Sequence, residues 1–189
     1  MSLTKEMVEL RCVRYDALPD LALYMDQVLS LLEKQLSPFA IEPGEKLITS
    51  TMINNYVKTH LIPPPEKKRY TKDHLAHLFI CALLKQVLTL SELETMLDTL
   101  RREHTVAQTY DRFCEELETA MHAVFGGDHH LLMLSENPTR SFLRATATAY
   151  ALQLYSRETV SRYRQSMDPV EEVKVEKKKK KKTEEAEER

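Results

Sequence analysis

Two adjacent asparagines, Asn54 and Asn55, stand out because the apolar spacing around them predicts a helix. Asparagine is a poor helix former, so a pair of them in a helix interior suggests a role other than helix stability. An asparagine side chain can pair with both hydrogen-bonding groups that adenine presents in the major groove, and Lys58 could reach guanine or phosphate. Thr51 shares this outward face. The alternative is a solvated polar face in which one asparagine bonds a neighbouring loop.

A short basic stretch follows this segment, after three consecutive prolines. Lys67, Lys68 and Arg69 would lie at the tip or on the return arm of a connection between two helices, where they could bind phosphate groups. Tyr70 is expected to pack on the core and to aim the basic arm. Residues 46–85 contain seven basic and two acidic residues, a balance of +5 in a chain of formal net charge −2. A local basic patch is typical of nucleic-acid-binding proteins, although charge-rich connections also occur without a ligand.

No other residues predict catalysis or metal binding. Asp128, His129 and His130 are similar to the DHH tripeptide of phosphoesterases, but that motif requires strand ends and further acidic clusters. We favour a loop between two helices for this segment. The cysteines are far apart in the sequence, lack any CxxC spacing and are expected to be buried reduced thiols: Cys12, Cys81 and Cys114. We therefore expect no catalytic residue, no metal site and no cofactor.

The elements that must position the polar residues are helical. Leucine, alanine, glutamate and lysine dominate, glycine is scarce with 3 residues, and 42% of the residues are hydrophobic, which predicts a mainly α protein with a substantial core. Apolar periodicity and capping residues predict helices over residues 21–36, 49–61, 72–87, 91–100, 106–125 and 138–164. Leu21 and Tyr24 are expected on the buried face of the first. The helix over 72–87 is apolar on several sides, which predicts a central place in the core.

The order of these elements resembles the DNA-binding domain of the MerR family of bacterial regulators. NNYVKTHLIPP is similar to that family's recognition helix and its exit, KRYTKDHLAHL to the wing return and next helix, and KQVLTLSELETML to the closing turn and helix. The same series is closer still, over roughly residues 21–100, to an uncharacterised domain-of-unknown-function family of Gram-positive bacteria thought to be related to MerR. His60 replaces the glycine that MerR proteins usually carry before the exit. About a dozen residues, rather than a tight turn, separate the first two helices.

The resemblance implies a MerR-like winged helix-turn-helix and a transcriptional regulator. We expect an N-terminal segment (1–20), the DNA-binding domain (21–103), a helical extension for dimerisation or effector binding (104–166) and a disordered charged tail (167–189). The expected partner is double-stranded DNA, bound by a homodimer, and any small-molecule effector is unknown. The contact residues would be the following eight: Thr51, Asn54, Asn55, Lys58, Lys67, Lys68, Arg69 and Tyr70.

Two other classes of function are weaker interpretations. A helical protein-interaction module, no longer binding DNA, would use apolar surface on the helices of residues 104–166. An enzyme is disfavoured because no nucleophile–base pair, phosphate loop or metal cluster is visible. The sequence has no apolar signal run and no stretch of the roughly 18 apolar residues that span a bilayer, so we expect a cytoplasmic, nucleoid-associated protein without membrane contact.

Overall fold

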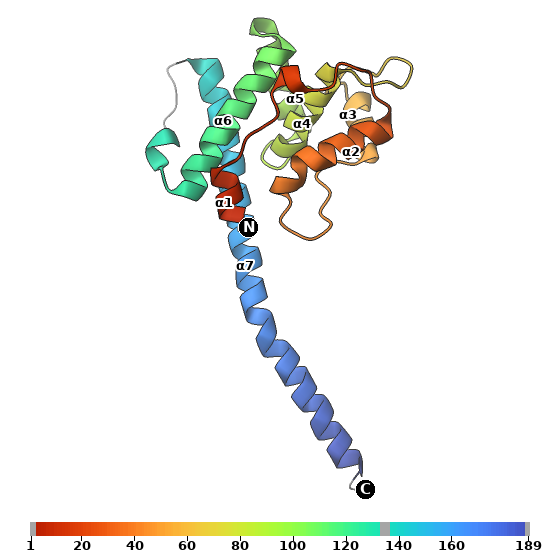
Figure 1. The fold of residues 1–189 in the computed structure, drawn as a ribbon, viewed down its shortest axis with the longest axis vertical. Helices are drawn as coiled ribbons and strands as arrows, with labels where there is room; N and C mark the ends of the chain where they lie inside the picture. Colours follow the sequence, from red (N-terminus) through yellow and green to blue (C-terminus); the bar gives the residue numbers. More distant parts are fainter. Residues whose placement is uncertain (1–2, 133–136, 188–189) are drawn as a thin grey trace. The chain divides into compact units, whose positions relative to one another are not determined.

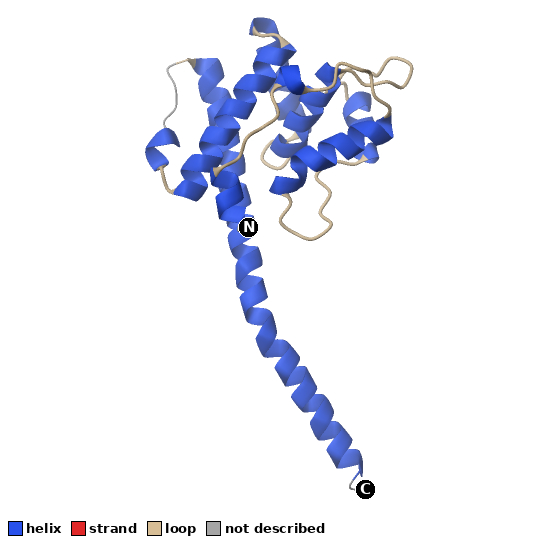
Figure 2. Ribbon diagram, viewed as in Figure 1, coloured by secondary structure: helices blue, strands red, loops and turns tan. Residues whose placement is uncertain are grey.

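The computed structural model describes residues 3–132 and 137–187, with side chains placed over 4–131 and 137–166. These residues form seven α-helices joined by loops and short 3₁₀ turns (Figures 1 and 2). The helices are α1 (Leu3–Val8), α2 (Met25–Leu36), α3 (Ser50–Lys58), α4 (Lys72–Leu84), α5 (Leu90–Glu103), α6 (Val106–Gly126) and α7 (Pro138–Glu187). The expected mainly α class is confirmed.

Helix α4 is the centre of the core, as its apolar sequence predicts. Every residue from His74 to Leu84 is buried. The Phe79 ring has three aromatic neighbours in edge-to-face contact, with centroids 6.3 Å from Phe39, 5.8 Å from Tyr110 and 6.4 Å from Phe113. Such contacts add to the free energy already gained by burying large rings. Helix α4 therefore provides a rigid support for the segments that precede and follow it in the chain.

Helix α6 holds the N-terminal arm, which we define as residues 9–20. The carboxylate of Glu118 accepts hydrogen bonds from the backbone of Cys12, at 2.7 Å, and from the guanidinium of Arg14, at 2.8 Å. The Tyr110 hydroxyl donates to the carbonyl of Val13 at 2.9 Å. The arm is thus tied to α6 by polar contacts. Helix α6 ends at Gly127, whose φ of +79° suits a residue without Cβ.

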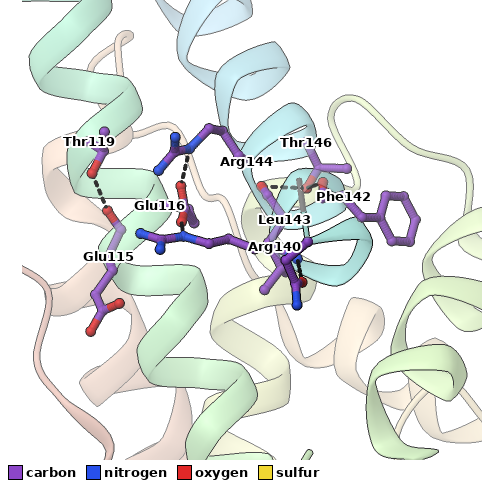
Figure 3. A network of polar contacts seen from close by, with 9 residues as sticks. Glu115, Glu116, Thr119, Arg140, Phe142, Leu143, Arg144 and Thr146 are labelled. Atoms are coloured by element: carbon purple, nitrogen blue, oxygen red, sulfur yellow. Dashed lines mark hydrogen bonds and ion pairs between the residues drawn. The ribbon is translucent and has the colours of Figure 1, made fainter. Parts of the chain in front are cut away.

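The first turns of α7 are held on α6 by a buried ion cluster (Figure 3). Glu116 is 2% exposed, and its two carboxylate oxygens accept bonds from Arg140 at 2.8 Å and from Arg144 at 2.5 Å. Figure 3 shows both guanidinium groups pointing toward this one carboxylate. Burial of the charge is tolerable because each oxygen has a cationic donor. The cluster thereby fixes α7 next to α6.

The start of α2 differs from the sequence prediction. The helix begins at Met25 rather than near residue 21, and Leu21 is 78% exposed. Tyr24, expected on the buried face, is about half exposed. The reason is a long-range pairing: the backbones of Leu23 and Tyr70 exchange two hydrogen bonds of 2.8 Å each. This antiparallel bridge keeps residues 21–24 extended.

The wing of the expected winged helix-turn-helix is not found. Residues 3–132 and 137–187 contain no β-strand (Figure 2). Where the hairpin was expected, the backbone makes two isolated bridges, between Glu66 and Arg69 and between Leu23 and Tyr70. Proline at positions 63–65 removes the backbone donors that a strand would need, which explains why no ladder extends from the turn.

The chain consists of two compact units, Met1–Tyr155 and Ser156–Arg189. Within the first unit, the apolar core includes residues from Met7 to Leu154. In the second unit, Arg162 pairs with Glu158 one turn earlier at 2.6 Å. The expected disordered tail, 167–189, lies outside the residues whose side chains are described. In the described helices, no stretch combines the length and apolar character needed to cross a membrane.

Candidate nucleic-acid interface

Helix α3 presents the expected polar face to solvent. The Thr49 hydroxyl caps the helix by accepting from the Met52 backbone at 3.2 Å. Ile53 and Tyr56 point into the core. The side chains at the intervening positions are exposed, as predicted: Thr51, Asn54, Asn55 and Lys58. Their spacing of three and four residues places all four on one side of the helix.

The end of α3 is shaped by a left-handed residue. His60 has φ +60°, a conformation that favours glycine and ends a helix without a further turn. Glycine would adopt this conformation at a lower cost in free energy than histidine does. The following Leu61 and Ile62 are buried and start the exit from the helix.

Two side chains from other helices form hydrogen bonds with the segment that follows α3. Arg101, from α5, donates to the carbonyl of Leu61 at 3.1 Å. The Thr71 backbone N–H donates to Nδ1 of His74, so the ring proton of neutral His74 is on Nε2, which donates to the Pro63 carbonyl at 3.2 Å. Burial lowers the pKa of His74 and favours this neutral form. The segment that follows α3 is therefore held at two carbonyls, those of Leu61 and Pro63.

The basic residues lie on a tight turn, which we call the basic turn (Glu66–Arg69). The Arg69 backbone N–H donates to the Glu66 carbonyl at 2.8 Å. The two central residues both have positive φ, +48° at Lys67 and +64° at Lys68. Two such residues in succession define a type I′ turn, which usually contains asparagine and glycine. Lysine at both positions costs backbone free energy, and strain of this kind clusters at functional sites.

The turn is anchored to α2 through Arg69. Its guanidinium lies 4.7 Å from the centroid of the Tyr24 ring and donates to the Tyr24 hydroxyl at 2.9 Å. The neighbouring Tyr70 is buried, with its ring 5.5 Å from that of His74 in an edge-to-face contact. Tyr70 therefore positions the turn from within the core, and Tyr24 orients Arg69 from the surface. Tyr24 was missed as a site residue because its spacing matched a buried helical stripe.

Ion pairing separates the basic residues of 46–85 into two groups. Lys46 pairs with Glu33 at 3.2 Å and Lys72 with Asp20 at 2.8 Å, while Lys85 is partly buried. The other four basic residues of this segment are exposed and have no carboxylate partner among the described residues: Lys58, Lys67, Lys68 and Arg69. These four are on α3 and on the basic turn, which follow one another with only residues 59–65 between them.

We define the contact face as seven exposed residues of these two elements, leaving out Ser50 and Glu66, which are also exposed. It combines amide groups and a hydroxyl on a helix with cations on an adjacent turn, which can bond bases and phosphates respectively. The remaining predicted residue, Tyr70, supports the face without being part of its surface. The contact face comprises Thr51, Asn54, Asn55, Lys58, Lys67, Lys68 and Arg69.

The other candidate groups have no such arrangement. Asp128 and His130 form a local pair at 2.6 Å beside a short 3₁₀ turn, as expected for a connection between helices. The described residues include no cluster of three or more histidine, cysteine or acidic side chains able to hold a metal ion. The three cysteines are free thiols, two of them buried and Cys12 partly so.

Comparison with known families identifies the family of this chain over its first half and beyond. Residues 13–113 match DUF1836, a domain of unknown function. The chain belongs to this family. The DUF1836 region runs from the N-terminal arm into α6 and includes the whole contact face with every residue that anchors it. Comparisons with curated proteins and with solved structures found no match. The likeness to MerR regulators therefore stays a hypothesis based on the sequence motifs.

Proposed function

We propose that this DUF1836 protein is a sequence-specific DNA-binding transcriptional regulator that binds double-stranded DNA as a homodimer. In this proposal α3 enters the major groove and the basic turn contacts the phosphate backbone next to it. The observation that carries the proposal is the strained, anchored basic turn beside the polar face of α3. Lys67 and Lys68 occupy left-handed positions with no carboxylate partner in the described part of the chain.

The polar face of α3 has the chemistry for base recognition. Asn54 and Asn55 are exposed, and no side-chain hydrogen bond occupies either amide among the described residues. An amide offers one donor and one acceptor side by side, which matches adenine in the major groove. Lys58, one turn further, can donate to guanine or phosphate. A merely solvated helix face would have no need for two residues of low helix propensity.

The anchoring contacts support a rigid interface. The exit of α3 is held at Leu61 and Pro63, and the basic turn is held at Arg69 and Tyr70. Since a contact residue that is already ordered loses less entropy on binding, such preorganisation favours affinity. The dimer is proposed because helix-turn-helix readers usually bind two half-sites about one DNA turn apart.

Selection of genomic fragments by the purified protein tests the proposal. We expect enrichment of a short motif arranged as an inverted repeat, which would demonstrate sequence reading and twofold symmetry together. A parallel selection with Asn54→Ala/Asn55→Ala should lose the motif while retaining weak binding to all fragments. Failure of the wild-type protein to retain DNA at low salt would contradict the proposal.

The alternative function is a protein-interaction module. It is favoured by exposed apolar side chains, such as Phe142 on the first turns of α7 and Val13 on the N-terminal arm. Isolated exposed apolar residues are common on soluble proteins, so this observation is weaker than the contact face. Recovery of a stoichiometric protein partner by a chain that retains no DNA would support the alternative.

A further inference from the structure

A mostly apolar cavity lies between the N-terminal arm and α2, away from the contact face. Its volume is about 390 Å³, within the range of small-molecule sites of roughly 300–1,000 Å³. The walls come from the arm, the second half of α2, the 3₁₀ turn η2 (Ser37–Phe39) and α4. Apolar side chains dominate these walls, among them Leu10, Leu31, Pro38, Phe39 and Phe79.

Two cations stand at the edge of this cavity. Arg11, from the N-terminal arm, and Lys34, from α2, both line it and are both exposed. Arg11 donates to the carbonyl of its neighbour Leu10 at 2.6 Å. Within the described residues neither cation has a carboxylate partner, in contrast to Arg14 nearby, which pairs with Glu118. The cavity therefore combines an apolar interior with an uncompensated positive rim.

A polar group also adjoins the interior. Gln35 lines the cavity, and its side-chain amide oxygen is buried without a hydrogen-bond partner among the described residues. Buried polar groups are nearly always bonded, so an unbonded one next to a cavity indicates a place for a ligand or water. Because the oxygen and NH₂ ends of an amide exchange by rotation, Gln35 can serve as a donor or as an acceptor.

We propose that this cavity binds a small organic carboxylate with an apolar body, and that occupancy changes the DNA affinity of the contact face. The apolar body would fill the space against Phe39 and Phe79, and the carboxylate would lie at the rim between Arg11 and Lys34. The binding site rests on the cavity alone. The regulatory half of the inference rests on the proposed function.

A short path connects the cavity with the contact face. Pro19 is part of the cavity wall, and four residues later Leu23 exchanges two backbone hydrogen bonds with Tyr70. Tyr24, next in the chain, immediately precedes α2 and holds Arg69. The opposite half of the same helix supplies Leu31 and Lys34 to the cavity. A ligand that shifts the arm against α2 therefore acts on the segment that positions the basic turn.

Calorimetric titration of the full chain with octanoate, in the absence of DNA, tests the binding site. For a ligand of this size we expect a dissociation constant of roughly 10 µM to 1 mM. Octanol, of similar length but uncharged, should bind roughly tenfold more weakly because it lacks two ion pairs of modest strength. If octanol binds as tightly as octanoate, or if neither binds, the assignment is overturned.

Three variants make the test specific. Arg11→Gln/Lys34→Gln should weaken octanoate to the level of octanol without affecting octanol. Lys5→Gln/Arg102→Gln removes the same charge away from the cavity and should change neither ligand. Ala17→Trp places a large ring at an exposed wall position and should weaken both ligands at least tenfold. Its melting temperature without ligand reports whether the fold is intact, and an intact variant that binds octanoate normally would contradict the site.

Repeating the DNA titration with saturating octanoate tests the regulatory half. We expect a change in DNA affinity, and by linkage the same factor must appear in octanoate affinity when DNA is bound. Octanoate binding with unchanged DNA affinity would overturn the regulation but support the site. Octanoate binding by a protein that binds no DNA would overturn the proposed function and leave the site standing. DNA binding without octanoate binding would do the reverse.

Discussion

The cluster around Glu116 and the contact face both contain cationic side chains, but the two regions use them in opposite ways. Arg140 and Arg144 converge on a buried carboxylate, so their charge is neutralised and serves to fix α7 on α6. Lys67 and Lys68 are exposed, have no carboxylate partner in the described part of the chain, and lie on a strained turn. The difference indicates that charges in the first region stabilise the fold, whereas those in the second are available to an external anion.

The largest expected effect is a loss of stability when the buried Glu116 cluster is disrupted. Glu116→Ala should reduce the free energy of unfolding by about 2–4 kcal/mol, because it removes a buried carboxylate that two arginines share, one of them the partly buried Arg144. The loss is below the upper range for buried pairs because the Arg140 side chain is 56% exposed and can be rehydrated. Urea denaturation measures the change. Glu115→Ala, at the adjacent exposed position, is the control, and equal effects of the two would refute the structural role.

The matching change on the contact face should affect binding but not stability. Asn54→Ala/Asn55→Ala should reduce the preference for the selected DNA site by about 1–3 kcal/mol for each asparagine that pairs with a base. The free energy of unfolding should stay constant or rise slightly, since alanine has the higher helix propensity. Fluorescence anisotropy with selected and scrambled duplexes separates the two effects. If the ratio of the affinities for the selected and scrambled duplexes were unchanged, α3 would not be the element that reads bases in the major groove.

Acidification should weaken the fold through two buried histidines of α4, His74 and His77. Burial lowers the folded-state pKa values of His74 and His77 below 6.5, so the unfolded chain binds more protons as pH falls. Stability is therefore complete above pH 6.5 and decreases below it, by up to about 1.4 kcal/mol per pH unit for each histidine. Urea midpoints at pH 7.5 and 5.5 measure this dependence. His74→Gln/His77→Gln should flatten it, and a double variant with the wild-type slope would argue against this cause.

Relaxing the basic turn should give a small gain in stability together with a loss of binding. Lys67→Asn/Lys68→Gly introduces the residues that a type I′ turn prefers and should stabilise the fold by about 0.5–1 kcal/mol. DNA affinity should fall because two phosphate contacts are removed. Thermal denaturation and anisotropy on the same samples test both statements. A gain in stability with unchanged affinity would show that the strained lysines have no part in DNA binding.

The sequence predicted the helices better than the connections between them. Helix α4 was recognised from its continuous apolar character, and α6, predicted over residues 106–125, spans Val106–Gly126. The start of α2 was wrong because the Leu23–Tyr70 pairing joins segments 47 residues apart, which local periodicity does not reveal. The wing was expected from the resemblance to MerR regulators, and only isolated bridges occur at its place.

Some features of the candidate site could likewise be predicted from the sequence, whereas others could not. Exposure of Thr51, Asn54, Asn55 and Lys58 follows directly from helical spacing around Ile53 and Tyr56. The positive φ angles of Lys67 and Lys68 could not be predicted, because lysine is not a residue that type I′ turns favour. The anchoring of Arg69 on Tyr24 depends on where α2 begins, and so was missed together with it.

The salt dependence of DNA binding tests the central claim most directly. Each phosphate contact contributes a slope of about −0.9 in log affinity against log salt, so Lys67→Ala/Lys68→Ala/Arg69→Ala should make the slope shallower by about 2–3. Lys5→Ala/Lys46→Ala/Arg102→Ala removes three charges away from the contact face and should leave the slope within about one unit of the wild type. Equal slopes for the wild type and the basic-turn variant would contradict the account.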